Sequence, residues 1–227
     1  MEDFTPTQET LVIPVDPEHS ALRLAVIGIF IVLGGIMFFV LNALIPSQGF
    51  NILAMLASFI ITALLTQQLE RLLKTRWPSG RTVRIAPDRV QIARRGRTEQ
   101  EIITGQQVNV LSWRFEVRRR SRVPKGWYIV ACALEQDDNY IPVYTFMSPQ
   151  SFDQLNAGGH FTRLVSQKEL NASNGAQGNL RMAGEQRRLH TAENARWFTG
   201  AEMSSDDFQR YIRRLQEQFP QWMPAIL

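Results

Sequence analysis

The sequence predicts an α+β membrane protein in which a two-helix transmembrane hairpin precedes an antiparallel β-sandwich or partly open barrel, closed by a C-terminal helix. Three observations predict this fold class. Two long apolar runs, 24–45 and 50–65, lie in the first third of the 227-residue chain. Apolar residues then alternate with polar ones, as in half-buried strands, and near the end of the chain they return to helical spacing.

The first apolar run, 24–45, has the length and composition of a membrane-spanning helix. Its twenty-two residues include one strongly polar side chain, Asn42. As a helix they extend about 33 Å, which is enough to cross a hydrocarbon core of about 30 Å. The preceding segment, 1–23, contains five acidic residues and one arginine. A secretory signal would begin with basic residues and have a shorter apolar core, so we expect this run to stay in the mature protein, preceded by an N-terminal segment at 1–23.

The second apolar run, 50–65, extends only about 24 Å as a helix, so it needs the following turn or a locally thinner bilayer to complete a crossing. We expect the second spanning helix and its juxtamembrane extension to cover 50–73. The intervening outer turn, 46–49, is short enough to require an antiparallel hairpin. Basic residues follow the second run and are missing from the turn, so the positive-inside rule places both chain ends in the cytoplasm; the basic residues are Arg71, Lys74, Arg76 and Arg81.

Each predicted span carries a stripe of small or hydrogen-bonding residues, where helix backbones can approach closely. The stripes either pack the hairpin on itself or offer a face to another membrane protein. Asn42 lies near the outer end of the first span and can also reach interfacial water. The first helix contributes Gly28, Gly35 and Asn42, and the second contributes Ala54, Ser58, Thr62 and Thr66.

A β-rich core is expected over 78–155. Two alternating segments flank Pro87 and Asp88, which favour a tight turn. Further on, the alternation slips by one residue at Val110 and Leu111, as a β-bulge or a bend would require. Pro142 indicates that the last strand is an edge or irregular strand. The expected strands are 82–86, 89–94, 98–103, 108–117, 127–134 and 140–146.

The remaining chain is predicted to contain a polar insertion, a last strand and a capping helix. The insertion, 156–192, is rich in Gly, Asn and Ser, and we expect it to be partly mobile with one or two short helices. The segment 193–227 is expected to hold a strand at 196–201 and a helix that Ser204 or Ser205 caps and Pro220 ends. One apolar stripe of that helix should cover the open end of the sheet; it consists of Phe208, Tyr211, Ile212, Leu215 and Phe219.

With these elements the chain resembles a pleckstrin-homology-like (PH-like) domain, and the whole layout resembles bacterial membrane proteins in which a helical hairpin precedes such a module. The segment Val-Gln-Ile-Ala-Arg-Arg-Gly at 90–96 is similar to the second strand and turn of those domains, and 208–219 is similar to their closing helix. The layout is also similar to the photosystem I assembly factor family of cyanobacteria and plastids, with 140–145 similar to a late strand. The resemblance implies a bacterial inner membrane or a thylakoid. The insertion at 156–192 departs from both patterns.

The residues that usually carry enzyme chemistry are few and scattered. His19 precedes the first span, while His160 and His190 lie in the polar insertion without a nucleophile elbow. Cys132 lies inside an apolar strand, where a thiol behaves as a small hydrophobe. The sequence offers neither metal-ligand spacing nor a phosphate-binding glycine loop. It therefore predicts a protein that is not an enzyme and has no cofactor and no metal.

A dense basic cluster surrounds the turn formed by Pro124 and Gly126. Three interpretations are open: a solvated loop, a contact with anionic lipid, and a contact with an acidic protein surface. A basic side chain near an anionic leaflet contributes about 1 kcal/mol. The residues predicted to make an anionic contact are Arg118, Arg119, Arg120, Arg122 and Lys125, with Arg114 nearby.

Together these features predict a non-enzymatic, membrane-anchored docking or scaffold protein whose cytoplasmic PH-like domain assists the assembly or stability of a larger membrane complex. The expected partners are membrane lipids and a membrane-protein complex, and neither nucleic acid nor a small-molecule ligand is expected. The alternative is an anionic-lipid-binding or membrane-stress sensor that needs no stable protein partner.

Overall fold

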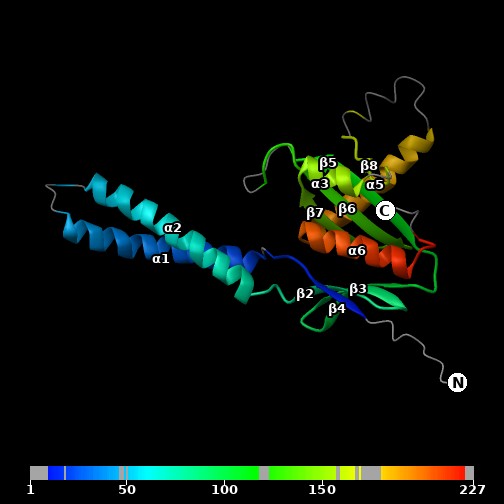
Figure 1. Cartoon of the computed structure of the whole chain (residues 1–227), viewed down its shortest axis with the longest axis horizontal. Helices are drawn as coiled ribbons and strands as arrows, with labels where there is room; N and C mark the ends of the chain where they lie inside the picture. The colour runs from blue at the N-terminus through cyan, green and yellow to red at the C-terminus, as the bar shows by residue number, and fades with distance from the viewer. Residues whose placement is uncertain are drawn as a thin grey trace. The chain divides into compact units, whose positions relative to one another are not determined.

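The computed structural model divides the chain into two compact units (Figure 1). One is a helical hairpin, Asp16–Ser79, and the other is a β-rich domain made of Met1–Val15 together with Gly80–Leu227. The β domain is therefore assembled from chain on both sides of the hairpin. The structure describes residues 10–17, 19–45, 49, 51–117, 123–156, 159–166, 169 and 180–222.

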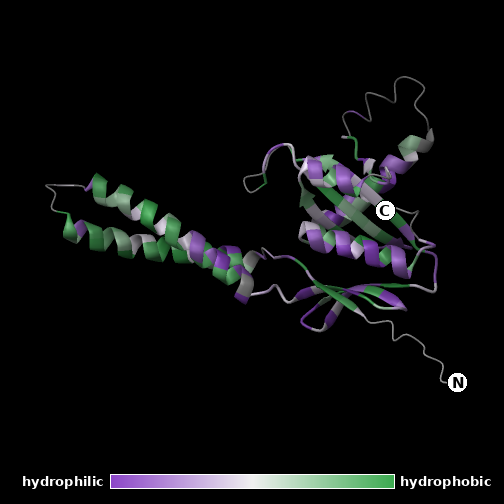
Figure 2. Cartoon of the chain, viewed as in Figure 1, coloured by the Kyte–Doolittle hydropathy of each residue, from purple (hydrophilic) through white to green (hydrophobic). Residues whose placement is uncertain are grey.

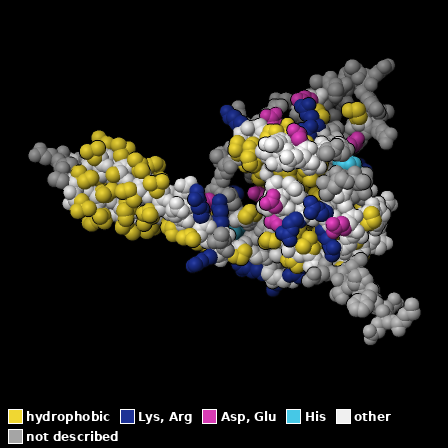
Figure 3. All heavy atoms as spheres, in the orientation of Figure 1, with side chains coloured by type: hydrophobic (Ala, Val, Ile, Leu, Met, Phe, Trp, Pro, Cys, Tyr) yellow, Lys and Arg dark blue, Asp and Glu magenta, His cyan; other side chains and the backbone are white. Residues whose placement is uncertain are grey.

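The hairpin consists of α1 (Ser20–Leu44) and α2 (Ile52–Arg76), as the two apolar runs predict. Apolar residues predominate on both helices except toward the end of α2, which is hydrophilic (Figure 2), and they gather on the surface of the hairpin (Figure 3). Asn51 begins α2, because its side chain accepts a hydrogen bond from the Ala54 N–H at 3.0 Å. The same side chain donates to the Ile45 carbonyl at 2.9 Å and so ties the end of α1 to the start of α2. Of the predicted outer turn, residues 46–48 lie outside the described residues.

The first sheet has four antiparallel strands in the order β1 (Leu11–Pro14), β2 (Arg81–Ile85), β3 (Arg89–Arg94) and β4 (Arg97–Ile103). The sequence predicts β2, β3 and β4 but not β1, which lies in the segment 1–23. In β1 and just after it, Ile13 and Val15 are buried in the core. Four residues ending in proline are too short to show an alternating pattern.

The second sheet has the order β8 (Thr162–Arg163), β5 (Asn109–Glu116), β6 (Tyr128–Gln136), β7 (Asn139–Met147) and β9 (Ala201–Glu202). The expected bulge at Val110 and Leu111 is wrong, because β5 pairs with β6 in continuous register. The apparent slip arises because both faces of this sheet are covered. Val110 packs against the core between the sheets, and Leu111 packs on the opposite face.

Pro142 does not lie in an edge strand, because β7 is paired on both sides. The two-residue turn that joins Gln136 to Asn139 sets the register, and it makes the pair Ala133–Pro142 a non-hydrogen-bonded one. The missing N–H of Pro142 therefore points away from β6. On that side β9 pairs only with the two following residues, Val143 and Tyr144, so the ladder loses no hydrogen bond.

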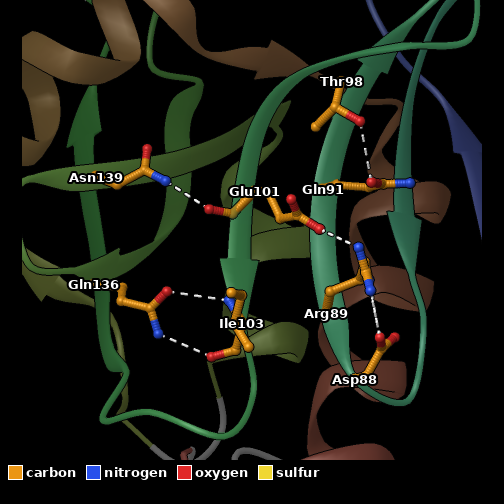
Figure 4. A network of polar contacts seen from close by, with 8 residues as sticks. All are labelled: Asp88, Arg89, Gln91, Thr98, Glu101, Ile103, Gln136 and Asn139. Carbon is orange, nitrogen blue, oxygen red and sulfur yellow. Dashed lines mark hydrogen bonds and ion pairs between the residues drawn. The ribbon is translucent and has the colours of Figure 1, made fainter.

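Side-chain amides join the two sheets where the backbone ladder stops (Figure 4). The Gln136 side chain accepts from the Ile103 N–H at 3.1 Å and donates to the Ile103 carbonyl at 2.8 Å. Asn139 donates to the Glu101 carbonyl at 2.6 Å. These three bonds attach β4 of the first sheet to the β6–β7 turn of the second sheet.

The main core lies between the two sheets, α3 (Pro149–Leu155) and α6 (Ser205–Gln218). In Figure 1, α6 lies between the two sheets, as the predicted capping role requires. The Ser204 side chain accepts from the Asp207 N–H at 3.1 Å and so begins the helix. The predicted apolar stripe is buried in full, since its members Phe208, Tyr211, Ile212, Leu215 and Phe219 are at most 3% exposed.

A long helix, α5 (Leu180–Thr199), occupies the end of the predicted insertion, 180–192, and most of the strand expected at 196–201. Only β9 remains of that strand. The helix lies on the outer face of the second sheet, where Leu189 and Ala192 are buried. Its buried face also includes the polar Gln186 and Arg196, and these two break the apolar periodicity on which the sequence prediction depends. Within the predicted insertion, residues 157–158, 167–168 and 170–179 lie outside the described residues.

Candidate functional site

Both helices of the hairpin are long and apolar enough to cross a membrane, over Ala21–Leu44 and Ile52–Lys74. Each helix has 25 residues and so extends about 37 Å. Large apolar side chains are exposed along the whole pair, for example Leu24 at 70%, Phe39 at 77% and Leu53 at 69%. An apolar surface of this extent is typical of contact with lipid or with another protein.

The two small-residue stripes have different positions in the hairpin. On α2, Ala54, Ser58, Thr62 and Thr66 are at most 6% exposed. A Cβ atom added to Gly34 of α1 would lie 3.8 Å from Thr62 Cγ2, so the α2 stripe packs against α1. The hairpin therefore uses the α2 stripe to pack on itself.

The α1 stripe faces away from this interface. Gly28, Gly35 and Asn42 are exposed, and a Cβ atom added to either glycine would meet nothing within 4 Å. Gly28 lies in a shallow apolar groove of about 440 Å³ on α1, lined by Ala25, Gly28, Ile29, Val32, Leu33 and Ile36. The α1 stripe remains open to the second interpretation, a contact with another membrane protein.

The strands on either side of the hairpin in sequence, β1 and β2, pair with each other in the β domain. β1 and β2 pair from Leu11 with Ile85 to Pro14 with Thr82. The Val15 N–H then donates to the Arg81 carbonyl at 3.1 Å. The connections between these strands and the helices are short, because they consist of residues 15–19 and 77–80. The chain thus leaves and re-enters the domain at neighbouring strands of one sheet.

Most of the predicted basic contact lies outside the described residues, since Arg118, Arg119, Arg120 and Arg122 all fall in the segment 118–122. Lys125 is exposed in the turn that leads into β6. Arg114 lies on β5, close to this segment, and its guanidinium group stacks over the rings of Tyr128 and Phe152 at 4.9 and 4.8 Å. Stacking holds the guanidinium plane in a fixed position against these two rings.

A groove of about 570 Å³ lies beside Arg114, between the ends of β5 and β6, β8 and α5. Its lining mixes both signs of charge. Arg163 forms an ion pair with Glu169 at 3.8 Å, and His190 Nε2 lies 3.0 Å from the Val165 carbonyl oxygen. The histidine is thus engaged with the backbone rather than with a nucleophile, and the groove is a polar recess next to the predicted loop.

Arg81, the first residue of β2, organises the end of the domain next to the hairpin connections. It is 7% exposed, and its guanidinium group donates to Glu99 at 2.7 Å and to the carbonyls of Thr199 and Gly200 at 2.6 and 3.0 Å. Glu99 is the extra residue of a β-bulge in β4, opposite the step from Ile92 to Ala93. A bulge redirects a side chain, and here it directs Glu99 toward Arg81.

The sequence prediction missed two exposed features at this end. The β3–β4 turn presents Arg94, Arg95 and Arg97 to solvent. The last turn of α5 presents Trp197 and Phe198, which are 75% and 83% exposed. Two adjacent aromatic residues in a polar stretch are a detectable signal, but its meaning depends on knowing that 196–199 is helical.

Potentially reactive groups of the domain are held in unreactive forms. Burial raises the pKa of the Cys132 thiol to about 12, so the thiol is protonated at neutral pH. Burial also raises the pKa of Tyr211 well above its usual value. Among the described residues, no group of three or more His, Cys, Asp and Glu side chains is placed to hold a metal ion.

Comparison with protein families, with curated proteins and with solved structures gives no match to this chain. The function is therefore inferred from the geometry described above.

Proposed function

We propose that the protein is a non-enzymatic, membrane-anchored docking protein. Its hairpin crosses the membrane, and its β domain receives a partner belonging to a larger membrane complex. The observation that carries the proposal is the pairing of β1 with β2. Because of this pairing, the strands that flank the apolar hairpin on both sides belong to one sheet. A domain attached at two neighbouring strands is confined to the membrane surface more strictly than a domain on one tether.

This confinement supplies the mechanism. Attachment by short connections raises the effective concentration of the domain at the membrane and limits its orientations. A partner in the same membrane then meets a surface that is already oriented, so binding requires less ordering. The positive-inside rule favours an arrangement with the domain and both termini in the cytoplasm, because Lys74 and Arg76 end the second helix. A bacterial inner membrane or a thylakoid fits this topology.

The strand order supports assignment of the β domain to the PH-like architecture. Along the chain, the strands of the first sheet end with β4. They are followed by β5, β6 and β7 of the second sheet and then by the closing helix α6, as in such domains. β1, β8, β9 and α5 are additions to that plan. PH-like modules commonly serve as binding scaffolds, but fold alone does not assign function.

The predicted basic loop is the part of the domain we propose to contact an anionic surface. Arg114 supports this role, because it adds a basic group close to the loop in sequence, held over the Tyr128 and Phe152 rings. The adjoining groove offers a recess for an acidic side chain of a partner. The loop residues assigned to this contact are Arg118, Arg119, Arg120, Arg122 and Lys125.

Purification of the tagged full-length protein in mild detergent tests the proposal. We expect a stoichiometric partner to co-purify with the wild type and to be lost when the five loop residues are changed to Ser. The matched control changes exposed arginines elsewhere, Arg187→Ser, Arg210→Ser and Arg213→Ser, and should retain the partner. A partner retained by the loop variant would contradict the assigned contact.

The alternative function, an anionic-lipid or membrane-stress sensor, is favoured by one observation. The exposed arginines of the β3–β4 turn lie at the end of the domain where the hairpin is attached. A sensor predicts that no partner co-purifies in stoichiometric amount, and that the behaviour of the domain changes with the anionic lipid content of reconstituted vesicles.

A further inference from the structure

Chain connectivity defines which end of the β domain lies near the bilayer. The connection after α2 consists of residues 77–80, which span at most about 14 Å when fully extended. The connection before α1 is of similar length and attaches at the same end of the sheet, where the Val15 N–H binds the Arg81 carbonyl. If the hairpin spans the membrane, as proposed above, this end is within reach of the lipid headgroups.

Three exposed arginines lie at this end. Arg81 and Arg94 are partners in the β2–β3 pair, and the Arg95 N–H donates to the Gly80 carbonyl at 2.8 Å. Arg97 faces Arg94 across the β3–β4 turn. The nearby acid, Glu99, is engaged by Arg81 and by Arg94, at 2.7 and 2.9 Å. The β3–β4 turn therefore presents an excess of positive charge beside the hairpin connection.

Two exposed aromatic side chains lie at the same end. Arg81 holds the carbonyls of Thr199 and Gly200, and Gln100 donates to the Thr199 hydroxyl at 3.2 Å. These bonds fix the last turn of α5, in which Trp197 and Phe198 are 75% and 83% exposed. The preceding residue, Arg196, is buried with its guanidinium group 4.6 Å from the centre of the Tyr144 ring. The helix end is thus anchored while both aromatic rings extend outward.

We propose that this end of the domain is a lipid-contact surface. Trp197 and Phe198 enter the headgroup region, and Arg94, Arg95 and Arg97 bind anionic headgroups. Tryptophan favours the membrane interface because its ring is apolar and its N–H is polar. Aromatic residues combined with basic ones are the composition by which surface segments bind anionic bilayers. The occupant is the bilayer that holds the hairpin, because the short connections leave little room for a third component at this end.

Fluorescence quenching in proteoliposomes tests the aromatic contact in the full-length chain. The variant Trp197→Cys carries an environment-sensitive fluorophore, and buried Cys132 stays unlabelled in the folded protein. The control is Met182→Cys, on the same helix and 62% exposed, about 22 Å away along the helix axis. In phosphatidylcholine–phosphatidylglycerol vesicles, we expect brominated lipids to quench the label at 197 more strongly than the label at 182. Quenching at 197 that is no stronger than at 182 overturns the proposal.

A second variant tests the arginines. Arg94→Ser, Arg95→Ser and Arg97→Ser are added to the labelled Trp197→Cys protein. We expect the quenching in anionic vesicles to fall to the level measured in pure phosphatidylcholine. The matched control, Arg210→Ser with Arg213→Ser on the exposed face of α6, should leave the quenching unchanged. Quenching that is insensitive both to phosphatidylglycerol and to the three substitutions overturns the role of the arginines.

Alkaline carbonate extraction of the same vesicles separates this inference from the proposed function. A protein that is released by carbonate has no membrane-spanning hairpin, which overturns both proposals. A protein that stays in the vesicles while the label at 197 remains unquenched retains the anchor and overturns the lipid-contact surface alone.

Discussion

At the scale of single residues, the arginine ion pairs of the first sheet are of two kinds, buried and exposed. Arg81 is buried and its donors are matched by a carboxylate and two backbone carbonyls. Arg89 is exposed, and its ion pairs with Asp88 and Glu101 lie in solvent. The ion pair lowers the pKa of the Asp88 carboxyl below its usual value, chiefly through the hydrogen bond from Arg89. The two arginines should therefore differ in their importance for stability.

We expect Arg81→Ala to lower the free energy of unfolding by about 3 kcal/mol, because it leaves buried acceptors without a partner. Arg89→Ala is the matched control and should cause little change, since exposed ion pairs contribute little. Thermal unfolding of the full-length protein in detergent measures both effects. Equal losses in the two variants would show that Arg81 does not lock α5 to the first sheet.

Stability should also decline at alkaline pH. Burial raises the pKa of Cys132 from 9.0 to about 12 in the folded protein, so the unfolded chain loses this proton first as the pH rises. The contribution is present in full below pH 9 and is lost between pH 9 and 12, at up to about 1.4 kcal/mol per pH unit. Tyr211 acts in the same direction, because burial raises its pKa as well.

Cys132→Ala should therefore show a shallower decline in unfolding free energy than the wild type over this pH range. Denaturant titrations at a series of pH values between 8 and 11 give the two slopes. If the slopes coincide, the thiol of Cys132 does not contribute to the alkaline loss.

At the scale of secondary-structure elements, α1 and α2 use their small residues differently. The α2 stripe is enclosed, since Ala54 and Thr62 are fully buried, whereas Gly28 and Gly35 on α1 have open space around them. A large side chain should therefore be tolerated on one stripe and not on the other.

We expect Ala54→Leu to destabilise the hairpin by about 1–3 kcal/mol, because the added volume pushes the helices apart. Gly35→Leu should leave hairpin stability unchanged. The readout is the unfolding of each variant in mixed detergent micelles. Destabilisation by Gly35→Leu would show that the α1 stripe packs within the hairpin. Loss of a co-purifying partner from a stable Gly35→Leu variant would favour the docking interpretation of that stripe.

The elements also show which parts of the fold can be predicted from the sequence. Strands with one covered face and helices with purely apolar stripes are predicted well, as β2, β3 and α6 illustrate. α5 is not predicted at this length and place, because its buried face is partly polar. Gln186 hydrogen-bonds to the neighbouring backbone there, and Arg196 forms an ion pair with Glu193. Polar residues that become buried by finding partners in the fold are indistinguishable from surface residues in the sequence alone.

The candidate sites follow the same rule. The α2 stripe was predicted because small residues recur at every fourth position, which is local information. The arrangement of Arg81, Glu99 and the end of α5 joins residues more than a hundred positions apart. Only the fold brings them together, so the exposed pair Trp197 and Phe198 could not be assigned to the end of the domain where the hairpin is attached.

At the scale of the whole molecule, the domain is completed by a strand that precedes the apolar hairpin. Ile13 of β1 is 1% exposed and contributes to the main core. Its neighbour Val12 lies on the opposite face of the strand and is 50% exposed. Residues 11–15 are therefore an integral part of the β domain.

We expect Ile13→Asp to destabilise the β domain strongly, because it places an unpaired charge in the core. Val12→Asp, the matched control, should have little effect. Limited proteolysis of the full-length protein, followed at the sites beyond residue 80, measures the stability of the domain in each variant. Equal protection in both variants would mean that β1 does not complete the core.

A related variant removes the hairpin. Since Val15 and Arg81 are already hydrogen-bonded, a two-residue Asn-Gly turn can replace residues 16–80 and join β1 directly to β2 in the native register. We expect this protein to be water-soluble and folded, with native-like circular dichroism and amide protection. By contrast, a fragment that begins at residue 80 should be less stable, because it lacks β1. If both proteins are equally stable, β1 is dispensable.

The position of β1 in the chain also determines when its pairing with β2 can occur during synthesis. This strand leaves the ribosome first, but its partner β2 follows only after the whole hairpin has been translated. If the hairpin spans a bilayer, as proposed, pairing requires the second helix to have returned the chain to the starting side. A nascent chain that inserts only one helix would then leave β1 and β2 on opposite sides, with the Ile13 core position unfilled. Completion of the β domain would therefore depend on the insertion of both helices.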